Sequence, residues 1–281
     1  MTVEQQFDWA FDRDDPPRPE DVDRARYMTA IIPADAQTLL DIGCGTGLVT
    51  RAVSQSRGAA GPRDVCGLEL SSVGVQRMQA IGLRCEKGSI GEVPFPDGSF
   101  DLVMANEVFE HLDDGLYAVA RRELARVARR YILVTVPNRD HLPTLTQICP
   151  TCGADTVPWG HLHSFREADL SHLFEGFEPI CIEAFGPAVP DGDRWLTQLL
   201  RLPRRLHHPL KGGMRCVACG YINSSPPQSR PSVSDLVRHP IRSFWYAVDF
   251  AAARGAPTCP RWLLALYRRS GGVAGPREAS H

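Results

Sequence analysis

The stretch TLLDIGCGTGLVT, Thr38–Thr50, decides the fold because it joins an apolar strand to a helix through three glycines. Glycine destabilises the interior of strands and helices, so its repetition here indicates a turn in which a ligand approaches the backbone closely. Asp41 precedes Gly43, Gly45 and Gly47 in the order D-x-G-x-G-x-G. This order differs from the G-x-G-x-x-G fingerprint of pyrophosphate-binding loops. A carboxylate beside the loop suits a ligand with a cationic head.

Apolar strands alternate with helices along the rest of the chain. Strand-like runs end in polar or turn residues and are followed by helical segments. This alternation predicts an α/β fold with helices on both faces of a mostly parallel sheet. We expect strands over residues 38–43, 64–70, 83–89, 98–106, 130–138, 177–185 and 261–269, and helices over residues 22–32, 47–56, 71–82, 115–129, 166–174 and 232–255.

The composition limits the classes of partner. A hydrophobic content of 43% and a charged content of 23% are ordinary for a globular protein. The formal charge of -2 gives no general attraction to nucleic acid or to anionic membranes. No run of apolar residues is long enough for a membrane span, and the acidic N-terminal segment lacks an apolar signal core. We therefore expect a cytoplasmic protein that does not contact membranes.

The motif LLDIGCGTG resembles the first motif of the class I S-adenosylmethionine-dependent methyltransferases, in their small-molecule branch. Later motifs follow in the order that this family shows: VCGLELS, residues 65–71, and the segment 87–114 that ends in EVFEHLDD. The resemblance covers about residues 35–185 and the last strand. It implies a Rossmann-like, doubly wound, seven-stranded and mostly parallel sheet that binds S-adenosylmethionine.

The resemblance also implies roles for individual residues. Asp41 would position the ammonium side of the methionine moiety, and Glu69 would bond both ribose hydroxyls. The adenine would lie against Gly88–Ile90, where Ser89 replaces the Asp or Asn of many relatives and would hold the adenine amine less specifically. The full set of implied cofactor-binding residues is Asp41, Gly43, Cys44, Gly45, Gly47, Glu69, Leu70, Ser89, Ile90, Asn106 and Glu107.

The residues after the fourth strand bear on the methyl acceptor. The segment EVFEHLDD, Glu107–Asp114, resembles the E-x-x-E-H-x-x-D pattern of small-molecule and lipid-quinone O-methyltransferases and of glycan- and antibiotic-pathway methyltransferases. It lacks the N/D-P-P-Y/F motif of enzymes that methylate base amines or glutamine amides. We therefore expect transfer to a hydroxyl, or to an amine, of a small molecule such as a sugar or glycan precursor or a natural-product intermediate, including anionic or glycosidic compounds.

Three histidines are candidate catalytic residues. His111 would lie near the sulfonium end of the cofactor, as a base or an orienting donor, or as a residue that packs beneath the cofactor. His161 and His163 lie in HLHSFREADL, where many relatives carry a similar stretch at the border of the acceptor pocket. Either histidine is a candidate general base.

Two C-x-x-C pairs, each followed by glycine, resemble the knuckles of a zinc ribbon: CPTCG with Cys149 and Cys152, and CVACG with Cys216 and Cys219. The first pair follows the fifth strand and the second follows the sixth, so both are expected at the carboxyl edge of the sheet. A structural zinc ion held by four thiolates would join these loops into a lid over the acceptor site. Redox-active or fortuitous cysteines, an iron–sulfur cluster, or a histidine replacing one sulfur are the alternatives.

A basic segment without acids after Asp193 lies between the pairs, in residues 194–215. It is either a solvated amphipathic surface or a cationic face for phosphate, a nucleotide-sugar, an acidic glycan or RNA. An RNA methyltransferase that docks through the knuckles is therefore an alternative function. A non-catalytic cofactor-binding regulator or scaffold is another.

These patterns divide the chain into four parts. We expect an N-terminal arm or cap over residues 1–33 and a methyltransferase core over residues 34–185 and 258–270. An inserted lid over residues 186–257 would be joined to residues 139–165 through the metal site. Residues 271–281 would form a loose tail, and the oligomeric state is left open.

Overall fold

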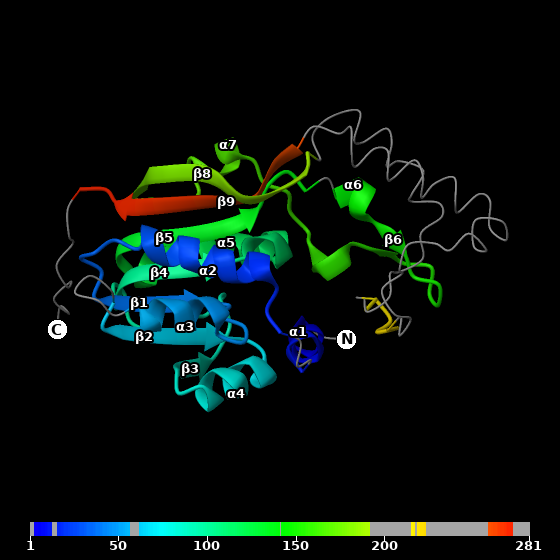
Figure 1. Cartoon of the computed structure of the whole chain (residues 1–281), viewed down its shortest axis with the longest axis horizontal. Helices are drawn as coiled ribbons and strands as arrows, with labels where there is room; N and C mark the ends of the chain where they lie inside the picture. Colours follow the sequence, from blue (N-terminus) through cyan, green and yellow to red (C-terminus); the bar gives the residue numbers. More distant parts are fainter. Residues whose placement is uncertain are drawn as a thin grey trace.

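A seven-stranded sheet with helices on both faces forms the body of the protein (Figure 1). The computed structural model describes residues 3–12, 16–56, 62–140, 142–191, 215–216, 218–222 and 258–271. The strands of the main sheet are β1 (Thr38–Ile42), β2 (Asp64–Glu69), β3 (Arg84–Lys87), β4 (Phe100–Asn106), β5 (Ala128–Pro137), β8 (Phe177–Pro190) and β9 (Thr258–Arg269). The helices are α1 (Val3–Phe11), α2 (Pro19–Ile31), α3 (Leu48–Gln55), α4 (Ser72–Ala80), α5 (Asp114–Val127), α6 (Leu142–Leu145) and α7 (Glu167–Leu170), with 3-10 turns η1 (Phe109–His111) and η2 (Pro158–Gly160).

The strand order is β3-β2-β1-β4-β5-β9-β8. The first five strands in this order are parallel, and β9 pairs antiparallel with both β5 and β8. Consequently β8 runs in the same direction as β5, and both end at the carboxyl edge, where open α/β sheets bind their ligands. The predicted Rossmann-like, doubly wound sheet is confirmed.

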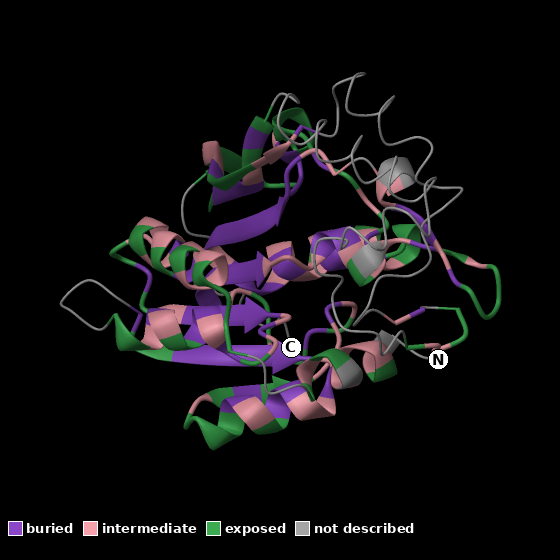
Figure 2. Ribbon diagram, turned by 45° about the vertical axis from the view of Figure 1, so that its right-hand side comes forward, coloured by how far each residue is buried: buried purple, intermediate pink, exposed green. Residues whose placement is uncertain are grey.

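Alternation along each strand supplies the two faces of the core. Leu39 packs in the cluster that contains Met28 of α2 and Val53 of α3, whereas Leu40 packs in the cluster that contains Leu124 of α5. All five side chains are fully buried. The inner strands of the sheet are mostly buried in Figure 2, whereas the edge strands β3 and β8 are mostly exposed or half-buried. Burial of the inner strands is expected for strands covered by helices on both faces.

The structure differs from the expected elements at several places, of which three are the clearest. Residues 3–11 form helix α1, where the sequence suggested a loose arm or cap. Strand β8 continues to Pro190 because it pairs with β9 along nearly its whole length, beyond the expected end at residue 185. Helix α7 spans four residues and is shorter than expected. The expected helix over residues 232–255 and most of the expected lid lie outside the described residues.

A small two-stranded sheet, β6 (Gln147–Ile148) with β7 (Asp155–Thr156), follows α6 and carries the first cysteine pair. Across the described part of the chain, no helix has the length and apolar character of a membrane span.

Candidate active site

The loop between β1 and α3 depends on its glycines for conformation and for space. Gly43, Gly45 and Gly47 have φ values of 71°, 56° and 86°, which disfavour residues with a side chain. A Cβ on Gly47 would lie 2.3 Å from Sδ of Met78, and one on Gly43 would lie 2.6 Å from Cγ2 of Val108. The loop therefore presents bare backbone at the carboxyl edge of the sheet.

Asp41, in strand β1, is hydrogen-bonded to residues of α3 and β4. Its Oδ2 accepts a 2.6 Å hydrogen bond from the Thr50 hydroxyl, and its Oδ1 accepts a 3.3 Å bond from Nδ2 of Asn106. The side chain is 1% exposed. Burial raises the pKa of Asp41 to about 7, although the Thr50 and Asn106 bonds favour the charged form. The strand-end acid therefore joins β1, α3 and β4 beneath the glycine loop.

Glu69, the last residue of β2, holds the other side of the loop. Its Oε2 accepts the Gly45 amide and its Oε1 accepts the Ser71 amide, both at 2.8 Å. Burial raises the pKa of Glu69, while the Ser71 and Gly45 amides act in the opposite direction. This carboxylate stands where the glycine loop meets β2, the position that the resemblance implies for the ribose contact.

The remaining implied cofactor residues lie around the same edge with different exposures. Sγ of Cys44 is 3.7 Å from Sγ of Cys85 in a buried cluster, so the Cys44 side chain points into the protein. Leu70 is partly exposed directly after β2, whereas Ile90 is buried. The Ser89 hydroxyl accepts a 3.1 Å hydrogen bond from the amide of Gly91.

Helix α1 covers the glycine loop. A Cβ on Gly45 would lie 3.3 Å from Cζ of Phe11. Oδ1 of Asp8 accepts hydrogen bonds from the Ser71 hydroxyl at 2.5 Å and from the Val73 amide at 3.3 Å. These contacts dock α1 on the N-terminus of α4. The acidic, proline-rich composition of the segment hid this helix.

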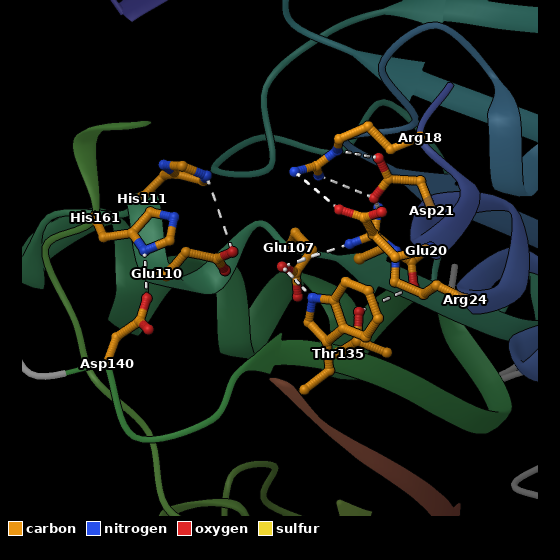
Figure 3. Close-up of polar contacts among 12 residues, drawn as sticks. Arg18, Glu20, Asp21, Arg24, Glu107, Glu110, His111, Thr135, Asp140 and His161 are labelled. Atoms are coloured by element: carbon orange, nitrogen blue, oxygen red, sulfur yellow. Dashed lines mark hydrogen bonds and ion pairs between the residues drawn. The ribbon is translucent and has the colours of Figure 1, made fainter. Parts of the chain in front are cut away.

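Glu107, the residue after β4, has a φ of 53° and turns toward α2 and β9 (Figure 3). Its Oε2 accepts a 3.0 Å hydrogen bond from Nε1 of Trp262 and pairs with Nη1 of Arg24 at 3.4 Å. Its Oε1 is buried and has no hydrogen-bond partner among the described residues. Burial raises the pKa of Glu107, against the Arg24 charge that lowers it. Sequence reasoning did not connect Arg24 or Trp262 with this edge.

The structure brings two of the three candidate histidines together. The ring centroids of His111 and His161 are 4.9 Å apart, and Nε2 of His111 is 3.9 Å from Oε1 of Glu110. Nδ1 of His161 lies 2.9 Å from Oδ2 of Asp140. Burial, followed by the charge of His161, lowers the pKa of His111 to about 4. The two imidazoles and the Glu110 carboxylate thus form one cluster (Figure 3).

His163 lies apart from this cluster. Its Nε2 is 2.7 Å from the carbonyl oxygen of Leu112, and its ring lies 4.9 Å from the ring of Tyr117. Its side chain is 25% exposed, so it is reachable from solvent while His161 is buried.

Glu110 is a site residue that sequence reasoning missed. Its side chain is completely buried, and neither Oε1 nor Oε2 has a hydrogen-bond partner among the described residues. Burial raises the pKa of Glu110 well above its ordinary value. The E-x-x-E-H pattern contained this residue, but no pattern indicates that its carboxylate is unpartnered.

The four paired cysteines meet, although about 60 residues separate the pairs. Sγ of Cys149 is 3.7 Å from Sγ of Cys219, and Sγ of Cys152 is 3.8 Å from Sγ of Cys216. A disulfide requires an S–S distance of about 2.05 Å, which these separations exceed. A tetrahedron of sulfurs at about 2.3 Å from a zinc ion has edges of about 3.8 Å, which these separations match.

Both pairs have the same knuckle geometry. In the first, the Gly153 amide donates to the Cys149 carbonyl at 2.9 Å, and in the second the Gly220 amide donates to the Cys216 carbonyl at 3.0 Å. Both glycines have positive φ, 70° and 77°. Burial opposes the ionisation of Cys216, but the Cys219 amide and the Thr156 hydroxyl lower its pKa to about 6. The cluster therefore offers four converging sulfurs.

Comparison with known proteins agrees with this geometry. Residues 40–131 match the family model of the methyltransferase domain. The chain is 35% identical over 136 residues to a probable chloroplastic tocopherol O-methyltransferase of Oryza sativa, across 43% of this chain and 36% of that protein. It is 29% identical over 166 residues to the O-methyltransferase resE of Aspergillus sclerotiorum, across 52% and 61%. The chain thus spans about one to two thirds of the length of these relatives.

Two solved structures share the fold across nearly the whole chain. One is a chain in the complex between the Haloferax volcanii Trm112 methyltransferase activator and a putative methyltransferase, with a TM-score of 0.56, 16% identity and coverage of 98% and 100%. The other is a SAM-dependent methyltransferase from Archaeoglobus fulgidus, with a TM-score of 0.55, 17% identity and coverage of 95% and 100%. The chain thus contains a methyltransferase domain over residues 40–131, and its strand order agrees with the expected class I S-adenosylmethionine-dependent methyltransferase fold.

Proposed function

We propose that this protein transfers a methyl group from S-adenosylmethionine to a hydroxyl, or to an amine, of a small molecule. The observation that carries the proposal is the bare glycine loop held between Asp41 and Glu69 at the carboxyl edge. The match to the methyltransferase domain supports S-adenosylmethionine as the cofactor. Transfer is an in-line displacement, for which the protein mainly provides proximity, orientation and, for a hydroxyl acceptor, a base.

The chain's residues divide this work. Glu69 bonds the ribose, and Asp41 orients the methionine moiety, directly or through water. His111, His161 and His163 lie on the segments that follow β4 and β5, at the acceptor side. Of these, His163 is the candidate base best exposed to an acceptor.

The small-molecule acceptor is supported by two observations. The residues after β4 lack the N/D-P-P-Y/F motif of base and glutamine methyltransferases. Relatives that match the core are named as O-methyltransferases, one of them for tocopherol. An assay with labelled S-adenosylmethionine and panels of phenols, sugars, amines and RNA tests this class. Label transferred to RNA alone would overturn it.

The first test concerns the cofactor. Glu69→Ala removes the carboxylate that faces the loop, so the affinity for S-adenosylmethionine should fall by about tenfold or more, which is about 1.4 kcal/mol. Calorimetric titration measures this change. Glu178→Ala, an exposed acid at the opposite edge of the sheet, is the matched control. Unchanged binding by Glu69→Ala would remove Glu69 from the site.

We also propose that Cys149, Cys152, Cys216 and Cys219 bind one structural zinc ion. The sulfur separations and the paired knuckles support it. Four thiolates leave no open coordination position, so the ion would support the loops after β5 and β8 and take no part in chemistry.

Metal analysis of protein purified without chelator tests the zinc proposal. We expect one zinc ion bound to these sulfurs, lost when Cys216 and Cys219 are both replaced by serine. Replacing Cys66 and Cys181 by serine, away from the cluster, should retain it. Wild-type protein without zinc would contradict the proposal.

A further inference from the structure

Three potential metal-binding groups meet in the interior of the carboxyl edge. One ligand atom from each of Glu110, His111 and His161 lies within 4.8 Å of the others. Glu110 and His111 are the last two residues of η1, and His161 follows η2. The amide of Leu162 donates to the Glu110 carbonyl at 2.6 Å, which ties the two segments together. The backbone therefore fixes this juxtaposition.

The Glu110 carboxylate lacks the partners that a buried acid needs. It is 0% exposed, and both of its oxygens are unpartnered within the described chain. Leaving a buried polar group unsatisfied is costly, and the cost is larger for a group that carries charge. Figure 3 shows the Glu110 carboxylate on the same side as the two imidazole rings. A cation bound between them would satisfy it.

His161 is held as metal-ligating histidines are. Its Nδ1 contacts the Asp140 carboxylate at 2.9 Å, which leaves Nε2 as the coordinating atom. A carboxylate on the second ring nitrogen fixes the tautomer and the orientation of a ligating imidazole. Asp140 would thus be a positioning residue outside the donor set.

The cluster lies beside the cofactor loop. Val108, two residues before Glu110, fills the space above Gly43. Phe7 of α1 packs edge-on against His111 with centroids 5.6 Å apart, and stacks on Phe11, which covers Gly45. The same helix therefore covers the glycine loop and the cluster.

We propose that Glu110, His111 and His161 bind one divalent transition-metal ion. Two imidazoles with one carboxylate suit zinc, iron(II) or cobalt(II), whereas magnesium and calcium take oxygen ligands. Three protein ligands leave coordination positions open. One consequence rests on the proposed function: an acceptor oxygen bound at an open position would be acidified beside the cofactor. In that case His111 and His161 are ligands and only His163 remains as a base.

Cobalt(II) binding to the full chain tests the site without an activity assay. Bound cobalt is counted after equilibrium dialysis, and the thiolate-to-cobalt charge-transfer absorption reports the cysteine cluster separately. We expect wild-type protein to bind one more ion than His161→Ala and His111→Ala, with unchanged thiolate absorption. Asp140→Asn should weaken this second ion by about 10- to 100-fold. The exposed His172→Ala is the matched control and should equal wild type.

Loss of the thiolate absorption in a histidine variant would indicate damage to the fold. Glu110→Gln, which preserves volume, then replaces that variant and should also bind one ion fewer. Equal stoichiometry in wild type, Glu110→Gln and His161→Ala would overturn the metal site. That result would leave cofactor binding by Glu69 untouched, so the two proposals fail separately.

Discussion

Three fully enclosed carboxylates at one edge of the sheet differ in whether the protein satisfies them. Asp41 and Glu69, beside the glycine loop, each accept hydrogen bonds from two donor groups. Glu110, in the 3-10 turn η1, accepts no hydrogen bond from a described residue. The exposed fractions of the three side chains are similar, between 0% and 4%. Burial raises the pKa of all three.

The difference separates two acids that accept hydrogen bonds from the glycine loop and its neighbours from Glu110, which we propose binds a metal ion. The donors around Asp41 and Glu69 come from the glycine loop and its neighbours, so these carboxylates stabilise the loop before any cofactor binds. Around Glu110, burial and then the charge of Glu107 disfavour the charged carboxylate, and the charge of Arg24 does not outweigh them. Nε2 of His111 lies 3.9 Å from Oε1 of Glu110, which is too long for a hydrogen bond.

The largest effect concerns pH and Asp41. The folded pKa of about 7 lies above the ordinary value of 3.8, so the folded state retains a proton that the unfolded chain loses. This contribution to stability is complete below about pH 4 and is lost as pH rises to about 7, by at most about 4 kcal/mol. Asp41→Asn should flatten that part of the profile. Urea unfolding of cofactor-free protein from pH 4.5 to 7.5 measures it, and parallel profiles for both proteins would contradict it.

An intermediate effect is expected for Glu69→Gln. The amide group of glutamine would place a donor against one of the amides of Gly45 and Ser71, so one hydrogen bond is lost and a buried donor is left unsatisfied. The free energy of unfolding should fall by about 1–3 kcal/mol. Denaturant unfolding without cofactor measures the change, with Glu178→Gln as control. A stability equal to wild type would place Glu69 with Glu110 as an acid that the fold does not use.

The smallest effect is expected for Glu110→Gln in chelator-treated protein. Glutamine has nearly the shape of glutamic acid, and the replacement breaks no hydrogen bond between the Glu110 carboxylate and another described residue. Unfolding free energies should agree within about 0.5 kcal/mol, the usual range for substitutions that break no specific contact. Thermal unfolding at pH 6 measures the change. A large loss would reveal partners for Glu110 and end the contrast with Asp41.

Much of the core was predictable because local patterns encode it. Strands β1, β2, β4 and β5 were predicted within a few residues, since buried parallel strands are continuous apolar runs. The meeting of the Cys149 and Cys216 pairs was predicted because each pair follows a strand, β5 or β8, that ends at the carboxyl edge of the sheet. Helix α1 was missed although its apolar side chains, among them Phe7 and Phe11, recur at helical spacing, because the acidic and proline-rich composition around it favoured an arm or cap without a helix.

The sequence by itself determined the sheet, the glycine loop and the resemblance to methyltransferases. It did so because residues 41–47 and Glu69 are contiguous with the strands that position them. Tertiary structure alone decided which polar groups have partners. It placed Phe11 on Gly45, Arg24 beside Glu107, and the two imidazoles beside Glu110. The physical reason is that burial and hydrogen-bond satisfaction depend on chain segments that are distant in sequence, and no local pattern records which donors they bring.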